Sequence, residues 1–187
     1  SYVDEGAQKI ILDAIHSTFP EHEILAEEGF EEQDIPLHDI PGWLWIVDPL
    51  DGTTNFMHGV PQYGVSIGLQ LDGQPVMGLV QDVNRNETFH AIAGQGAYMN
   101  DRPCRVSSRH HLADCLITTG FPYKQFRYMD GYTEAIRRFW TDSRGVRRPG
   151  SASLDLAWVA CGRFDGFFEH GIEAWDVAAG LLIVEEA

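Results

Sequence analysis

The spacing of apolar residues along the chain changes several times between a helical and an extended pattern. Between Asp4 and Phe19 the apolar residues recur at helical spacing, and Pro20 stops the run. The same spacing predicts helices over residues 129–140, 151–161 and 174 onward. Short apolar or alternating segments predict strands at residues 24–26, 43–47, 64–71, 76–83, 88–93, 116–119 and 164–168, with a basic strand around Val146.

The order of these elements predicts a layered α/β architecture, an α+β sandwich. Tight turns at Asp72-Gly73 and at residues 84–86 separate three consecutive strands, which predicts an antiparallel meander. Later helices and strands alternate along the chain. We therefore expect an N-terminal α+β part with an antiparallel sheet over residues 1–110 and a C-terminal α/β part over residues 111–187, with a soft boundary near residues 107–114.

The helical patterns run almost to both ends of the chain. Ser1 opens directly onto the first helical pattern, and the last apolar helix reaches Ala187 without a Gly stop signal. We therefore expect the chain to be truncated at both ends. The acidic segment of residues 29–39, broken by Pro36, predicts a mobile loop.

The charge and composition of the chain exclude several functional classes. The 187 residues carry a formal net charge of −15, which opposes nonspecific binding to nucleic acid or to an anionic membrane surface. The 3 cysteines have no C-x-x-C spacing and indicate a reducing compartment. No window approaches about 18 uninterrupted apolar residues. We expect a cytoplasmic protein that binds no membrane and no nucleic acid directly.

The string WIVDPLDGTTN, which begins at Trp45, concentrates the chemistry. Asp48 and Asp51 lie three residues apart in a predicted turn, so both carboxylates can face one point at the mouth of the strand. Carboxylates and a backbone carbonyl such as that of Leu50 suit Mg²⁺ or Mn²⁺. Residues 52–54 open a short helix whose first N–H groups can receive a phosphate. A turn with capping aspartates would explain Asp-Gly alone, but the whole string favours a site where metal and phosphate meet.

Three segments carry a resemblance to a known family. WIVDPLDGTTNF, AEEG at residues 26–29 and EAWDVAAG at residues 173–180 closely resemble the signatures of the inositol monophosphatase family, especially its bacterial members. The similarity extends to GVSIGL, GQGAYMN, TTGFP, PGSASLDLAWVACG and DGFFEHG. The resemblance implies an αβαβα architecture and a magnesium-dependent, lithium-sensitive phosphatase that forms a homodimer.

The resemblance also implies a metal cage made of carboxylates and one carbonyl group. Asp48 would bridge two metal ions, and Glu28 would support its neighbour Glu27. In isolation, Glu27 would be a solvated charge and Asp176 an acid that offsets a helix dipole, but their spacing in the chain matches the family. The metal ligands assigned in this way are Glu27, Asp48, the carbonyl oxygen of Leu50, Asp51 and Asp176.

Further roles follow from the same resemblance. Asp4 falls where the family keeps an acid that pairs with the threonine of the motif, although Asp4 could also be a helix N-cap. Gly29 replaces the serine that usually follows the glutamate pair, which loosens the loop. The catalytic residues assigned in this way are Glu27, Thr53 and Asp4. The substrate-binding residues are Gly52, Thr53, Ser151, Ala152 and Glu169.

Several alternatives remain open at the level of sequence. Relatives with similar cages cleave fructose 1,6-bisphosphate, histidinol phosphate or phosphoadenosine phosphate rather than inositol monophosphate. A different class is a regulatory protein that contacts RNA polymerase in antitermination. A basic cluster could serve that role, or could cover an ordinary surface or a dimer interface; it comprises Arg137, Arg138, Arg144, Arg147 and Arg148. No histidine is assigned to a metal.

Overall fold

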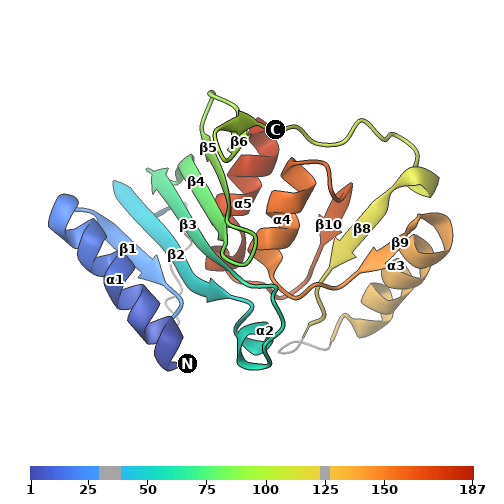
Figure 1. The fold of residues 1–187 in the computed structure, drawn as a ribbon, viewed down its shortest axis with the longest axis horizontal. Coiled ribbons are helices and arrows are strands. Elements are labelled where there is room, and N and C mark those ends of the chain that lie inside the picture. The colour runs from blue at the N-terminus through green and yellow to red at the C-terminus, as the bar shows by residue number, and fades with distance from the viewer. Residues whose placement is uncertain (30–38, 123–126) are drawn as a thin grey trace.

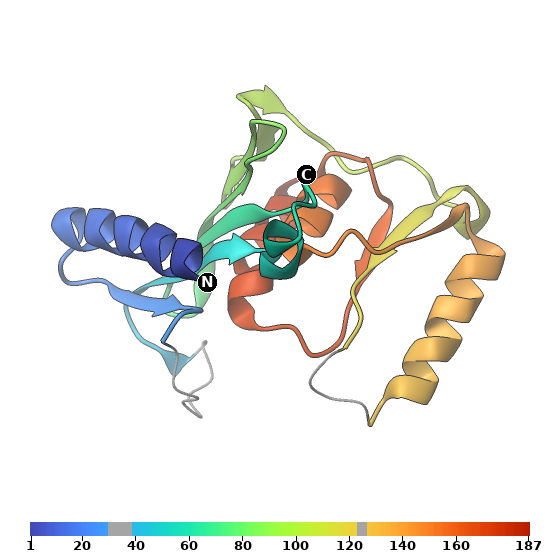
Figure 2. The same cartoon turned by 60° about the horizontal axis from the view of Figure 1, so that its bottom comes forward.

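The computed structural model describes residues 1–29, 39–122 and 127–187. The chain forms five layers in the order helix, sheet, helix pair, sheet, helix (Figure 1), and both views keep the helix pair between the two sheets (Figure 2). The layered α/β prediction is confirmed. The loop predicted at residues 29–39 lies almost wholly outside the described residues. The helices of the layers are α1 (Tyr2–Thr18) outside the first sheet, α4 (Ala152–Ala160) and α5 (Ala174–Glu186) in the middle, and α3 (Met129–Asp142) outside the second sheet.

The first sheet is the antiparallel meander that the alternating segments predict, extended at one edge by a parallel strand. Its strands follow the order of the sequence, with β1 parallel to β2 and each later pair antiparallel. These strands are β1 (Glu23–Ala26), β2 (Trp43–Asp51), β3 (Gly64–Leu71), β4 (Gln74–Asp82), β5 (Glu87–Ile92), β6 (Ala97–Met99) and β7 (Arg102–Pro103). A short helix, α2 (Thr53–Met57), follows directly at the end of β2.

The second sheet is small and wholly parallel. Its order is β10 (Gly166–Phe168), β8 (Leu116–Thr119) and β9 (Gly145–Arg147), and a 3-10 turn at Leu112–Asp114 precedes β8. The proposed division of the chain near residues 107–114 stays a prediction. Among the described residues, no helix is long and apolar enough to cross a membrane.

Two differences from the predicted elements concern strands. The predicted strand 43–47 was too short, because β2 continues through Asp48 to Asp51. The strands β6 and β7 were not predicted; they have only 3 and 2 residues, too few to show an alternating pattern.

The middle layer explains why α4 and α5 are apolar on almost every side. Leu154, Ala157 and Ile183 are fully buried between the two sheets, where a helix has little solvent-exposed surface. On the neighbouring strand β4, a Cβ at Gly78 would lie 2.5 Å from the carbonyl oxygen of Ala179 in α5. Small residues on both elements therefore let α5 approach the sheet closely, which fixes the position of the helix and of its first turn.

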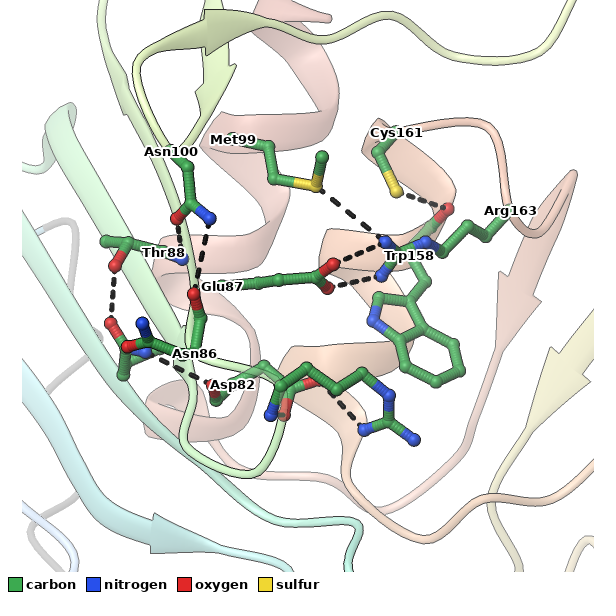
Figure 3. Close-up of polar contacts among 11 residues, drawn as sticks. Asp82, Asn86, Glu87, Thr88, Met99, Asn100, Trp158, Cys161 and Arg163 are labelled. Atoms are coloured by element: carbon green, nitrogen blue, oxygen red, sulfur yellow. Dashed lines mark hydrogen bonds and ion pairs between the residues drawn. The ribbon is translucent and has the colours of Figure 1, made fainter.

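A polar cluster ties the β4–β5 turn to the end of α4 (Figure 3). The Arg163 guanidinium pairs with both oxygens of Glu87, at 2.5 and 2.7 Å. Arg85, which pairs with Asp82 at 2.9 Å, also lies 4.6 Å from the ring centroid of Trp158. These contacts hold α4 against the sheet at the end of the helix away from Ser151.

Candidate metal and phosphate site

A bulge in β2 brings the two aspartates of the sequence motif to one side of the sheet. Asp48 pairs with Ser66 and Asp51 pairs with Gly64, so three steps on β2 match two steps on β3. Residues three apart in a regular strand point to opposite faces, and the additional residue of a bulge restores the same face. The Asp48 carboxylate accepts a hydrogen bond of 2.9 Å from the Leu50 N–H inside this bulge. The motif was predicted as a turn, and the structure corrects it to a bulged strand end.

Asp176 completes a group of three carboxylates from the first turn of α5. Its Oδ2 accepts the Glu173 N–H at 2.7 Å, half of a reciprocal capping box that fixes the start of the helix. Asp48, Asp51 and Asp176 each offer one carboxylate oxygen, and these three oxygens lie within 4.8 Å of one another. Because α5 packs closely on the sheet, Asp176 lies next to two aspartates that precede it by 125 or more residues in the sequence.

Asp51 is oriented by the beginning of α4. Its Oδ2 accepts hydrogen bonds from Ser151 Oγ at 2.7 Å, from the Ser153 N–H at 2.7 Å and from Ser153 Oγ at 2.5 Å. Ser151 is the N-cap position of α4, but its hydroxyl binds Asp51 instead of the helix backbone. Sequence reasoning missed Ser153, because a serine inside a helix is common on purely structural grounds.

Glu27 and Thr53 lie in the same pocket. Glu27 follows β1, and its N–H donates to the Val47 carbonyl at 3.2 Å, which extends the β1–β2 pairing up to the site. Thr53 Oγ1 lies 3.1 Å from Asp4 Oδ1 and 3.0 Å from the Leu50 carbonyl oxygen. Asp4 is fully buried in the first turn of α1, where Ser1 is the N-cap. The structure therefore pairs Asp4 with the motif threonine, and the N-cap reading of Asp4 is wrong.

The remaining predicted residues lie in the same pocket, of about 370 Å³, between α2, α4 and α5. Glu169 follows β10, and a Cβ at Gly120 would overlap its carboxylate, so a larger residue there would displace the Glu169 side chain. Neither Gly120 nor Arg148, the basic residue of the lining, was predicted. The pocket is lined by Glu27, Asp48, Leu50, Asp51, Gly52, Thr53, Thr54, Gly120, Arg148, Gly150, Ser151, Ala152, Glu169, Ile172 and Asp176.

The carboxylates of the site carry an uncompensated negative charge. Burial, and then repulsion from Asp51 and Glu27, raises the pKa of Asp48 well above its usual value. Burial and the same kind of repulsion raise the pKa of Asp176 to about 7. Two unit charges less than 5 Å apart repel by roughly 3 kcal/mol at an effective dielectric constant of about 20.

This donor set fits a divalent metal ion. Among the described residues, no ion pair joins a lysine or arginine to Asp48, Asp51 or Asp176. Converging carboxylate oxygens are hard donors of the kind that Mg²⁺ and Mn²⁺ prefer. A bound cation would supply the charge that the protein itself lacks at this point.

Comparisons with known proteins give a consistent result. The sequence pattern of the inositol monophosphatase family matches residues 1–187. Nus factor SuhB of Pasteurella multocida is 43% identical over 187 residues, which cover 99% of this chain and 68% of that protein. A putative Nus factor SuhB of Neisseria meningitidis serogroup B is 46% identical and is covered over 70% of its length. The structure of inositol monophosphatase from Anabaena superposes with a TM-score of 0.89 at 44% identity, covering 98% of this chain and 71% of that one.

Proposed function

Because this chain belongs to the inositol monophosphatase family, we propose that it hydrolyses a small polyol phosphate, with inositol monophosphate as the first candidate. One observation carries the proposal: three carboxylates from β2 and α5 converge within 4.8 Å beside the first turn of α2. Such a cluster is costly unless a cation neutralises it. A phosphate ester suits both features, because its anionic oxygens can bind the cation and the free N–H groups at a helix N-terminus.

The metal ligands of the proposal are those predicted from the sequence: Glu27, Asp48, the Leu50 carbonyl oxygen, Asp51 and Asp176. When bound there, Mg²⁺ or Mn²⁺ would neutralise the phosphate and lower the pKa of a water molecule. Hydrolysis of a phosphate monoester is among the slowest reactions in water, so positioning and electrostatics must supply on the order of 20 kcal/mol.

The chain's own residues bind and orient the reactants. The backbone N–H groups of Gly52 and Thr53, at the start of α2, receive the phosphate oxygens. Thr53 Oγ1 orients the attacking water, and Asp4 fixes this hydroxyl from behind. Burial raises the pKa of Glu27, which favours its role as the group that accepts the proton of that water.

The substrate's hydroxyl groups would meet the part of the pocket lined by Ser151, Ala152 and Glu169. Burial raises the pKa of Glu169 to about 7, and its carboxylate can accept hydrogen bonds from a polyol. The Ser151 hydroxyl donates to Asp51, and its oxygen can still accept a hydrogen bond. Ala152, the next residue, also lines the pocket. These contacts favour a polyol phosphate over a featureless ester.

A panel of phosphate-release assays tests the proposal. The substrates are inositol monophosphate, fructose 1,6-bisphosphate, histidinol phosphate and phosphoadenosine phosphate, each with Mg²⁺ and with a chelator. We expect Mg²⁺-dependent release that is fastest from inositol monophosphate. Faster release from another substrate would reassign the substrate, and no release from any substrate would contradict the enzymatic proposal. Light scattering on the same sample tests the homodimer, and cell fractionation tests the cytoplasmic location.

A second candidate function is regulatory binding to RNA polymerase. The curated relatives are named Nus factor, and the arginine cluster offers a basic surface. Two of its members are already paired, Arg137 with Glu134 at 2.7 Å and Arg144 with Asp114 at 3.2 Å. Exposed Arg147 and Arg138 remain as contact groups. Stable binding of purified RNA polymerase that is lost in Arg147→Ala, without phosphate release, would favour this candidate over hydrolysis.

A further inference from the structure

The side-chain amide of Asn55 joins three backbone carbonyl groups from two distant parts of the chain. Its Nδ2 lies 2.7 Å from the carbonyl oxygen of Gln62, 2.9 Å from that of Pro149 and 3.2 Å from that of Gly150. An amide has two N–H donors, so one of them is shared between two acceptors. The opposite orientation would place Oδ1 against three carbonyl oxygens, and the donor orientation therefore follows from the surroundings.

These carbonyl groups lie where two backbone segments touch. A Cβ at Gly52 would lie 2.9 Å from the Gln62 oxygen and 3.3 Å from the Gly150 oxygen. Gly52 and Gly150 have φ values of 95° and 93°, which side chains rarely tolerate. A Cβ at Gly150 would in turn lie 3.0 Å from Asn55 Nδ2. The contact has no room for another side chain, and the Asn55 amide is the group that bonds across it.

The helix that carries Asn55 cannot hold its position alone. α2 has only 5 residues, too few for independent stability, and it has no buried residue. Yet its first turn and the turn at residues 150–152 form two adjoining walls of the pocket, which meet where Gly52 approaches the Gly150 carbonyl oxygen. Among the parts of the chain that the structure describes, the side-chain bonds from α2 to the 149–150 turn are those of Asn55.

We propose that Asn55 is a positioning residue, which holds the first turn of α2 in register with the turn at residues 150–152. This inference rests on the proposed function for its consequence, since these two walls are where the phosphate and the substrate's hydroxyl groups would bind. Asn55 acts through the backbone and touches neither metal nor substrate. Losing the amide would loosen the first turn of α2 against the backbone of residues 149–150, while Asp48, Asp51 and Asp176 keep their own hydrogen bonds.

The first test measures hydrogen–deuterium exchange of the metal-free protein and needs no activity. In Asn55→Ala we expect faster exchange in peptides that cover residues 50–57 and 148–153. The matched control is Met57→Ala, on the same helix, where the side chain is 63% exposed. Unchanged exchange at residues 148–153 in Asn55→Ala would overturn the inference. If that variant does not fold, Asn55→Ser, which keeps one hydroxyl donor, serves instead, with the same expectation.

The second test separates positioning from general stability. Calorimetry measures the Kd of Mg²⁺ alone and the Kd of inorganic phosphate at saturating Mg²⁺. We expect Asn55→Ala to weaken phosphate binding by about tenfold to a hundredfold, as misplaced binding groups do, and to change the Mg²⁺ Kd by less than about threefold. Equal weakening of both, or a lower Tm with both constants unchanged, would overturn the inference. Absence of Mg²⁺-dependent phosphate binding in the wild type and in Met57→Ala would contradict the proposed function, and the exchange experiment would still decide the role of Asn55.

Discussion

Replacing Asp176 by asparagine should stabilise the protein without metal and destabilise it, relative to the wild type, with metal. Burial and neighbouring acids raise the pKa of Asp176 to about 7 in the folded protein, above the ordinary value of 3.8. A carboxyl group whose pKa is raised on folding is accommodated best when protonated. The folding free energy lost by ionising Asp176 is therefore absent below about pH 4, grows as the pH rises toward 7, and is constant above that.

The size of the effect follows from this pKa shift. A difference of about three pH units corresponds to at most roughly 4 kcal/mol, at about 1.4 kcal/mol per unit. The side chain is only half-buried, so solvent screening reduces the expected gain of Asp176→Asn at pH 8 to about 1–2 kcal/mol. The asparagine Oδ1 still accepts the Glu173 N–H, which preserves the capping box. Mg²⁺ should reverse the order, because it stabilises the folded wild type by mass action and binds the variant more weakly.

Thermal unfolding at about pH 5 and about pH 8, each in chelator and in excess Mg²⁺, measures these differences. In chelator at pH 8 the variant should melt roughly 2–8 °C above the wild type, with a smaller gap at pH 5. The matched control is Asp130→Asn, which removes an exposed acid from the first turn of α3 and should show neither effect. A lower Tm for metal-free Asp176→Asn at pH 8, or equal Mg²⁺ stabilisation of both proteins, would refute the reasoning.

Three further predictions concern other parts of the site. Glu169→Gln should leave the Mg²⁺ Kd unchanged and reduce discrimination among polyol phosphates by about 1–3 kcal/mol. The measurement compares kcat/KM for inositol monophosphate with kcat/KM for para-nitrophenyl phosphate, and an equal loss on both substrates would show that Glu169 supports the metal instead. The side-chain amide of Gln8 donates to the Glu28 carbonyl oxygen at 2.7 Å and accepts the Glu28 N–H at 3.1 Å. Gln8→Ala should therefore free the segment that carries Glu27 and raise the Mg²⁺ Kd by roughly tenfold in calorimetry; an unchanged Kd would refute this support. Submillimolar to millimolar Li⁺ should inhibit phosphate release, as the family resemblance implies, and Li⁺ insensitivity would contradict that expectation.

Much of the site could be predicted because its donors lie in short, unusual strings. Asp48 and Asp51 share one motif, and Asp176 stands in another, so the convergence of all three could be inferred from the family resemblance. Local pattern also located the helices to within a few residues, since 3.6-residue spacing persists over several turns. The layered α/β class followed from the alternation of these elements, and the αβαβα order followed from the family resemblance.

The missed features depend on contacts between distant segments. The bulge that turns Asp48 and Asp51 to the same side is visible only in the pairing of β2 with β3. The second serine that binds Asp51, Ser153, has no sequence signal because the hydrogen bond spans 102 residues. Gly120 matters only because the Glu169 carboxylate occupies the space that a Cβ would take. Such requirements arise from packing, which periodicity does not report.

The most direct test of the central claim is phosphate release from inositol monophosphate by the wild type and by Asp51→Asn. The variant should fold, because its amide oxygen can still accept the hydrogen bonds that Ser151 and Ser153 donate. We predict that a chelator abolishes release by the wild type, that Mg²⁺ restores it, and that Asp51→Asn loses about a hundredfold or more in kcat at saturating Mg²⁺. Release that is insensitive to chelator, or an unchanged kcat in folded Asp51→Asn, would contradict a metal-dependent phosphatase site at Asp48, Asp51 and Asp176.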